Sequence, residues 1–304
     1  NDFETEDLIV EAAGLIDNGS DWLVVGAGDS SEVLRFNGQT DSNSGGFAEV
    51  LAQLKSGTGT QPILTGGAFD ADNLLYVVDD ASGYIYKIDT ANGRILATSQ
   101  FPYGGRDIVV ANGRVYVASD NGDQIVTLRT SDLSTLSETF APLPPDLVGN
   151  GDYSIAAGPA VLGNDLFLAY STATITFSPL TITPSGAIRR INETTGAFIT
   201  EWIPVSDPNL TTPLDLAIDD AGNLFVVDRS ADGTTFRVLR YAGDTAFDGV
   251  VIASRSMNVD RPELRPRIEI GPDGALYLSD PNTGEITRHD RMTGALLDDP
   301  FVTA

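Results

Sequence analysis

The sequence has no cysteine and a single histidine, and these two absences remove several kinds of chemistry. Without cysteine there is no disulfide framework, no thiolate metal site and no cysteine nucleophile. Only His289 could act as an imidazole base or ligand. A histidine metal cluster is therefore excluded, and a Ser-His-Asp triad would depend on this one residue.

Positive charge is scarce as well. The chain has 18 Lys and Arg against 43 Asp and Glu, which gives a formal net charge of −25 at pH 7. A field of this sign repels phosphate backbones and anionic lipid surfaces, so we expect no nucleic-acid partner. The longest apolar runs, such as Leu74–Val78, have the length of a strand. A transmembrane helix needs roughly 18 apolar residues, so we expect no membrane insertion.

What the chain does contain is a repeat built on a short apolar strand that ends in aspartate. Taking Leu23, Tyr76, Tyr116, Phe167, Phe225 and Tyr277 as one slot, the copies are 53, 40, 51, 58 and 52 residues apart. Such spacing is typical of propeller blades. The four clear copies are Leu74–Asp79, Arg114–Asp120, Asn223–Asp228 and Ala275–Asp280, and the two divergent copies are Asp21–Val25 and Asp165–Ala169.

Each copy continues into a second alternating strand with a basic or polar residue in its middle, as in Ile85–Asp89 and Val238–Tyr241. Turn sequences such as Asn92-Gly93 then lead to a further strand. We therefore predict an all-β fold, a six-bladed β-propeller with four-stranded antiparallel blades, in a single domain that closes by packing of the last blade on the first. The predicted blades are 8–54, 62–101, 104–142, 150–206, 210–256 and 262–304.

Two segments, Asp219–Asp228 and Gly271–Asp280, resemble the NHL-type repeat, in which a D-x-x-G-N-L-Y-V-x-D pattern recurs once per blade. The segment Ile286–Leu297 resembles a phrase that recurs in extracellular bacterial propeller proteins. The resemblance implies the fold and an extracellular or periplasmic bacterial location. It implies little about activity, because the same strand and turn rules occur in proteins of many functions. The chain begins Asn-Asp-Phe, and we expect a mature form or a recombinant product.

The enzymes to compare are the calcium-dependent gluconolactonase-like and paraoxonase-like six-bladed propellers, which hold a metal in the central channel. Aligned on the turn pattern, their ligand positions correspond to the triplets Pro213-Leu214-Asp215 and Arg265-Pro266-Arg267, and both lack the ligand. Glu11 lies where that family carries an early metal-binding glutamate. One carboxylate without partners makes no hard-cation site.

Three residues on predicted innermost strands form the best candidate polar cluster: Asp107, Asp215 and Arg267. Their side chains are expected to face the axial channel, where Arg106 and Asp152 would be close enough to join them. The alternative to a ligand site is a structural ion pair across the channel.

The strand-ending acids allow a second hypothesis, a weak Ca²⁺ site at the pairs Asp79-Asp80 and Asp219-Asp220, because hard cations need several oxygen ligands. The alternative is that each strand-ending Asp accepts hydrogen bonds from the amides of the following turn. His289 occupies a slot that is apolar in the other blades, so it is expected to be buried rather than catalytic.

These observations favour a monomeric, non-catalytic extracellular propeller that binds a protein, a glycan or a surface ligand, with Ca²⁺ as the candidate cofactor. The alternative is a metal-dependent hydrolase or lyase that acts at the central channel through Asp107, Asp215 and Arg267. Lengthened connections at 143–153, 171–186 and 228–235 are where a propeller gains binding function. The segment 171–186 is expected to form an exposed hairpin or two strands that extend past their blade.

Overall fold

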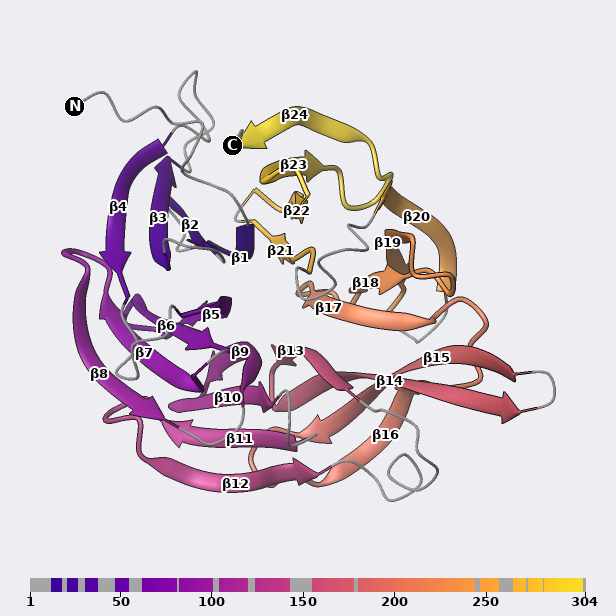
Figure 1. Ribbon diagram of the computed structural model, residues 1–304, viewed down its shortest axis with the longest axis horizontal. Helices are drawn as coiled ribbons and strands as arrows, with labels where there is room; N and C mark the ends of the chain where they lie inside the picture. Colours follow the sequence, from indigo (N-terminus) through magenta and orange to yellow (C-terminus); the bar gives the residue numbers. More distant parts are fainter. Residues whose placement is uncertain are drawn as a thin grey trace.

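The computed structural model is a ring of six four-stranded antiparallel sheets, each built from four consecutive strands (Figure 1). The structure describes residues 12–17, 21–26, 31–37, 47–54, 62–80, 82–100, 104–119, 124–142, 155–177, 180–243, 247–256, 265–271, 273–280 and 282–302. In every blade the first strand lies innermost and the fourth outermost. The predicted all-β propeller of six four-stranded blades is confirmed, whereas the exact blade limits remain predictions.

The strand bounds are as follows. Blade one has β1 (Ala12–Asp17), β2 (Asp21–Gly26), β3 (Glu32–Asn37) and β4 (Phe47–Gln53), and blade two has β5 (Leu64–Phe69), β6 (Leu74–Asp79), β7 (Tyr84–Asp89) and β8 (Arg94–Gln100). Blade three has β9 (Gly105–Ala111), β10 (Arg114–Ser119), β11 (Gln124–Arg129) and β12 (Thr135–Pro142), and blade four has β13 (Ile155–Leu162), β14 (Asp165–Phe177), β15 (Leu180–Asn192) and β16 (Phe198–Ile203). Blade five has β17 (Thr212–Ile218), β18 (Leu224–Arg229), β19 (Thr235–Tyr241) and β20 (Phe247–Ser256), and blade six has β21 (Ile268–Ile270), β22 (Leu276–Asp280), β23 (Glu285–His289) and β24 (Leu296–Val302).

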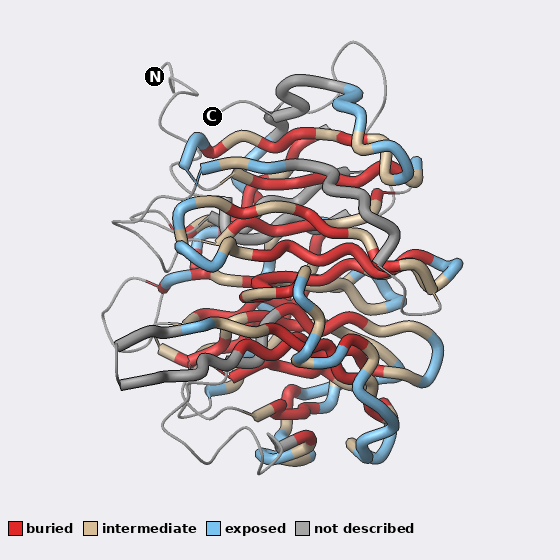
Figure 2. Tube along the Cα trace, turned by 90° about the vertical axis from the view of Figure 1, so that its right-hand side faces the viewer, coloured by how far each residue is buried: buried red, intermediate tan, exposed pale blue. Residues whose placement is uncertain are grey.

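The core lies between the faces of neighbouring blades. The second strand of each blade reads as a short continuous apolar run because both of its faces are covered: from Leu75 to Asp79, every residue of β6 is buried. Strands at the rim are different, and β8 and β16 are largely exposed. Figure 2 shows this layering, with buried stretches in the middle of the strands and exposed ones at the turns.

The basic residue in the middle of the third strand ties its blade to the next one. Lys87 Nζ on β7 donates a hydrogen bond of 2.7 Å to the carbonyl of Thr130 in blade three. Arg35 on β3 donates to the carbonyl of Thr90 in the same way, and Arg240 on β19 donates to that of Met292 at 2.7 Å. The recurring basic position in the sequence repeat is therefore explained by contacts between blades.

The ring closes where β1 lies beside β21 and β22, without a strand shared between the first and last blades. Among the described residues, the structure has no helix that is long and apolar enough to cross a membrane.

Blade four departs from the repeat through its two central strands. β14 and β15 pair from Asp165↔Asn192 to Phe177↔Leu180 with no irregularity, so they run on together past the other strands of the blade. Of the two alternatives for this segment, the structure therefore shows one hairpin made by extension of two blade strands. Figure 1 shows this hairpin projecting beyond the body of the ring.

Candidate functional site

The innermost strands enclose a cavity of about 640 Å³ along the axis of the ring. Residues of β5, β9, β13, β17 and β21 line it, with turn residues at one end. At the end where these strands begin, three charged side chains converge, and they form the floor of the cavity. They are Asp107, Asp215 and Arg267, from blades three, five and six.

Arg267 occupies the centre of this group. Its Nη1 lies 2.9 Å from Asp107 Oδ2 and 3.5 Å from Asp215 Oδ1. Its Nη2 donates to the backbone carbonyl of Arg106 at 2.6 Å and to that of Thr65 in blade two. One guanidinium therefore joins four of the six blades. The three side chains are named below the axial triad: Asp107, Asp215 and Arg267.

The carboxylates of the triad are also held by the main chain. Asp107 Oδ1 accepts a hydrogen bond of 2.8 Å from its neighbour Ile108 N. Asp215 Oδ1 accepts from Leu216 N at 2.9 Å, and its Oδ2 accepts from Ile268 N of blade six at 2.8 Å. Such charge-assisted bonds fix both side-chain orientations.

Glycine makes room for each carboxylate on the neighbouring innermost strand. A Cβ on Gly66 would lie 2.3 Å from Asp107 Oδ1, and a Cβ on Gly158 would lie 2.8 Å from Asp215 Oδ1. Gly158 also has φ of 52°, a conformation that other residues rarely adopt. The strand register shifts at this level in each of these four blades, and such bulges redirect side chains toward the axis.

Burial controls the ionisation of the triad. It raises the pKa of the Asp107 carboxyl, against the opposing effect of Arg267. Burial also raises the pKa of Asp215, to about 7, and the neighbouring charge of Asp107 adds to that rise. For Arg267, burial alone would lower the pKa, but the two carboxylates raise it above its ordinary value. Because two acids share one base, a proton bound near neutral pH belongs to the carboxylate pair rather than to either residue.

The turn end of the cavity carries a second acidic group. Asp219 and Asp220 line the cavity there together with Arg291. Asp219 Oδ1 accepts hydrogen bonds from Asn223 N at 2.8 Å and from Ala221 N at 3.0 Å, and its Oδ2 lies 3.7 Å from Arg291 Nε. The side chain of Asp219 therefore organises the turn that follows β17.

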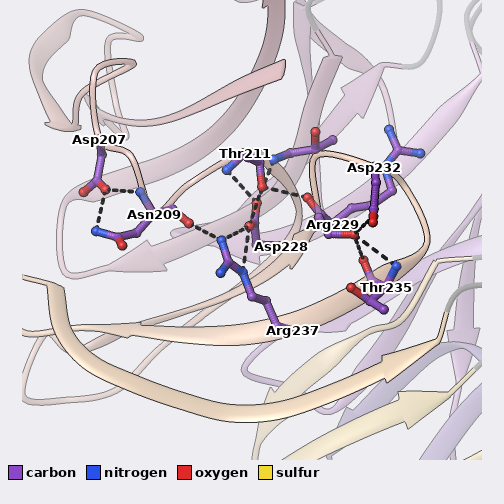
Figure 3. Close-up of polar contacts among 10 residues, drawn as sticks. Asp207, Asn209, Thr211, Asp228, Arg229, Asp232, Thr235 and Arg237 are labelled. Carbon is purple, nitrogen blue, oxygen red and sulfur yellow. Dashed lines mark hydrogen bonds and ion pairs between the residues drawn. The ribbon is translucent and has the colours of Figure 1, made fainter. Parts of the chain in front are cut away.

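The strand-ending aspartates close polar networks inside their own blades. Asp228 is fully buried at the end of the apolar part of β18, and burial raises the pKa of its carboxyl. Its Oδ1 accepts from Thr211 N at 2.9 Å and Thr212 N at 2.7 Å, and its Oδ2 lies 3.1 Å from Arg237 Nη2 (Figure 3). Asp79 is equally buried and accepts from Ile63 N at 2.8 Å.

These contacts differ in part from the predicted ones. Asp280 does accept from the following turn, at Asn282 N, 2.9 Å away. Asp79 and Asp228 instead accept amide hydrogen bonds from the residues that lead into the innermost strand of the same blade. The reason is that this backbone begins next to the end of the second strand, where its first amides have no ladder partner.

Among the described residues, no group of three or more His, Cys, Asp or Glu side chains is arranged to hold a metal ion. Of the predicted metal ligands, Asp80 packs against Gly104, where a Cβ would meet Asp80 Oδ1 at 2.3 Å. Glu11 and the channel candidate Asp152 lie outside the described residues. Arg106 takes part in the channel through its carbonyl.

His289 is buried, with 3% of its surface exposed, as the apolar slot predicted. Its Nε2 lies 3.0 Å from Thr287 Oγ1 on the same strand, β23. The residues that sequence reasoning missed are Thr65, Gly66 and Gly158. The signal was available for the two glycines, because they occupy on their strands the slot that holds Asp107 and Asp215 on the next ones.

Comparison with solved structures supports the fold. The chain is similar to the Myceliophteria thermophila Cps50 (Swd1) β-propeller domain, with 13% identity, TM-score 0.60, and coverage of 95% of this chain and 86% of that one. A chain of the nidogen/laminin complex gives 15% identity, TM-score 0.61 and 92% coverage of both chains. Kuenenia stuttgartiensis hydrazine synthase gives 12% identity, TM-score 0.60, and coverage of 96% and 99%. At these identities the likeness shows the fold alone.

No curated protein sequence matches the chain. A family model does match, and it covers residues 32–297, which include all of blades two to five and most of blades one and six. The matched family differs from the NHL-type repeats that the blade pattern resembles, although both give propeller blades of strands and turns. The chain belongs to the propeller family described as outer membrane protein assembly factor BamB.

Proposed function

We propose that this protein is a non-catalytic binding propeller that acts outside the bacterial cytoplasm, in the periplasm or at the outer membrane, and that its ligand is another protein. The family description, outer membrane protein assembly factor, supports both the location and a protein ligand. The likeness of the blade pattern to NHL-type repeats is compatible with this proposal, since it reflects strand and turn rules rather than a reaction.

The observation that carries the proposal is the use made of the axial triad. Asp107, Asp215 and Arg267 are each less than a tenth exposed, and each is bonded to another member of the triad and to backbone atoms. A catalytic group must exchange such partners for a substrate, and breaking a buried ion pair is strongly unfavourable. The triad therefore supports a role in holding the blades together, which leaves the outer surfaces for binding.

One observation favours the alternative, a hydrolase or lyase at the channel. Asp215 lines the cavity and its pKa is raised to about 7, mainly by burial, and carboxyls poised in this way serve as general acids and bases. In that case Asp107 and Arg267 would position the substrate, and a metal bound in the cavity would activate water.

Two assays separate these functions. In the first, the immobilised protein is exposed to a β-barrel outer-membrane protein diluted from urea and, as a control, to an acidic soluble protein treated in the same way. We expect saturable binding of the barrel protein alone, and absence of such binding would contradict a role in outer-membrane protein assembly. In the second, hydrolysis of δ-gluconolactone and p-nitrophenyl acetate is followed with and without Ca²⁺. Turnover that Asp215→Asn abolishes in a folded protein would establish the enzyme instead.

A further inference from the structure

The extended hairpin of blade four has two long edges that no described strand covers. We call residues 172–177 of β14 and 180–185 of β15 the arm. β13 pairs with β14 only as far as Ile155↔Ser171, and β16 pairs with β15 only from Ile188↔Ile203 onward. Within the described part of the chain, the arm strands therefore pair only with each other, from Thr172↔Ser185 to Phe177↔Leu180. Figures 1 and 2 both show the arm projecting from the ring.

The register identifies which backbone groups face outward. Gly186 N donates a hydrogen bond of 3.0 Å to Leu210 O, so this amide points away from its cross-strand neighbour Ser171. In an antiparallel ladder, pairs that bond to each other alternate with pairs whose amides and carbonyls point outward. The pairs Ala173↔Pro184 and Ile175↔Ile182 lie two and four residues further along, so they also point outward. Pro184 agrees with this phase, because proline has no N–H to give to a ladder.

The two edges of the arm are not equivalent. On β15 the outward series contains Pro184, which has no donor, and Gly186, whose amide is already bonded. On β14 the outward series of Ala173 and Ile175 keeps its donors and acceptors. Proteins normally blunt an exposed edge with charge, proline or a bulge. The β14 edge has none of these three devices, which is the pattern of an edge that receives another strand.

Charge indicates what kind of strand it receives. Residues 171–188 contain no charged side chain, although the whole chain carries −25. The arm extends for roughly 20 Å at about 3.3 Å per residue, which exceeds the Debye length of about 8 Å at physiological ionic strength. A neutral or basic segment can therefore reach the edge without repulsion. A second copy of this chain would bring another charge of −25, and an acidic partner is disfavoured for the same reason.

We propose that the β14 edge of the arm binds an extended, neutral or basic segment of another protein by strand addition. The proposal rests on the proposed function, because it assumes a protein ligand, and it specifies the site and the chemistry of that ligand. Main-chain hydrogen bonds from Ala173 and Ile175 hold the added strand, and β-branched residues in alternation suit it because they favour extended backbone.

The test uses a labelled peptide of alternating Thr and Val with a Lys at each end, and fluorescence anisotropy measures its binding to the full chain. Ile175→Pro removes one outward amide from the β14 edge. Ile182→Pro is the matched control, because it removes the outward amide of the cross-strand partner on the opposite edge. Neither change removes a bond between β14 and β15. We expect Ile175→Pro to weaken binding at least tenfold and Ile182→Pro to change it less than twofold.

Two further peptides keep the test independent of how well the variants fold. The same peptide with alternate amides N-methylated is expected to lose binding, and the peptide with Glu in place of Lys is expected to bind several-fold more weakly at low salt. Equal binding of the methylated peptide, equal effects of the two proline variants, or a dimer in sedimentation that Ile175→Pro disrupts would each overturn the proposal. If Ile175→Pro still binds the unfolded barrel protein unchanged, the arm proposal fails while the proposed function stands.

Discussion

Replacement of Arg267 by methionine is the most direct test of the axial triad. The change removes the cation that faces Asp107 and Asp215 and the donors to the carbonyls of Thr65 and Arg106. Removing one partner of a buried ion pair destabilises a protein by about 3–5 kcal/mol, because the remaining charge stays buried and uncompensated. We expect Arg267→Met to lower the free energy of unfolding by that amount at pH 8.

The loss depends on pH in a defined direction. The folded pKa of Asp215 is about 7, well above an unfolded value of about 3.9, so the folded state binds a proton more tightly. Stability from that proton is complete below the unfolded pKa and is lost as pH rises through 7. Without Arg267 the carboxylates hold protons more strongly still, so acid neutralises the exposed defect. At pH 5 we expect only about 1–3 kcal/mol of loss, from the carbonyls of Thr65 and Arg106.

Urea unfolding followed by the fluorescence of the two tryptophans measures these differences at pH 5 and pH 8. Arg291→Met is the control, since Arg291 lies in the same cavity but its side chain is a third exposed and its ion pair with Asp219 is 3.7 Å long. Such a pair contributes at most about 1 kcal/mol. If Arg267→Met were no more destabilising than Arg291→Met, or equally so at both pH values, the triad would not be the tie described here.

Two further predictions concern the histidine and cations. His289→Phe should lower the free energy of unfolding by less than about 2 kcal/mol, because the ring is buried and of similar size, and only the contact with Thr287 is lost; loss of the cooperative transition in thermal melts would contradict this. Calcium and sodium chloride at equal ionic strength should raise the melting temperature equally, since screening relieves a net charge of −25, while Asp79 and Asp219 already accept amide hydrogen bonds. A calcium-specific increment, worth about 2.7 kcal/mol at a hundredfold excess over Kd, would instead reveal a site.

The fold was largely predictable from the sequence because one physical requirement repeats in every blade. A strand covered on both faces must be apolar throughout, and the strand-ending Asp caps the amides that lead into the innermost strand, so both leave a mark once per blade at Leu74–Asp79 and its counterparts. The convergence of Asp107, Asp215 and Arg267 followed from their equivalent slots on innermost strands.

The remaining features of the site could not be predicted because the repeat does not encode them. The reach of Arg267 to the carbonyl of Thr65 joins residues on blades two and six, and a carbonyl has no residue type that would reveal it. The direction of the Asp79 side chain depends on the backbone that leads into β5, not on the turn that follows in sequence. Periodicity likewise left open whether segment 171–186 folds back or extends, since the choice depends on pairing beyond the blade.

Closure without a shared strand gives the chain an unusual freedom of connectivity. Every blade is contiguous in sequence, and β1 and β21 meet only through side-by-side packing. The peptide bonds between blades therefore set the order of the blades but not the geometry of any one of them. A circular permutant that links the present ends and opens the chain between two other blades should build the same ring. In that permutant the present seam becomes an internal junction, and the axial triad still forms, because its residues depend on place around the axis rather than on order along the chain.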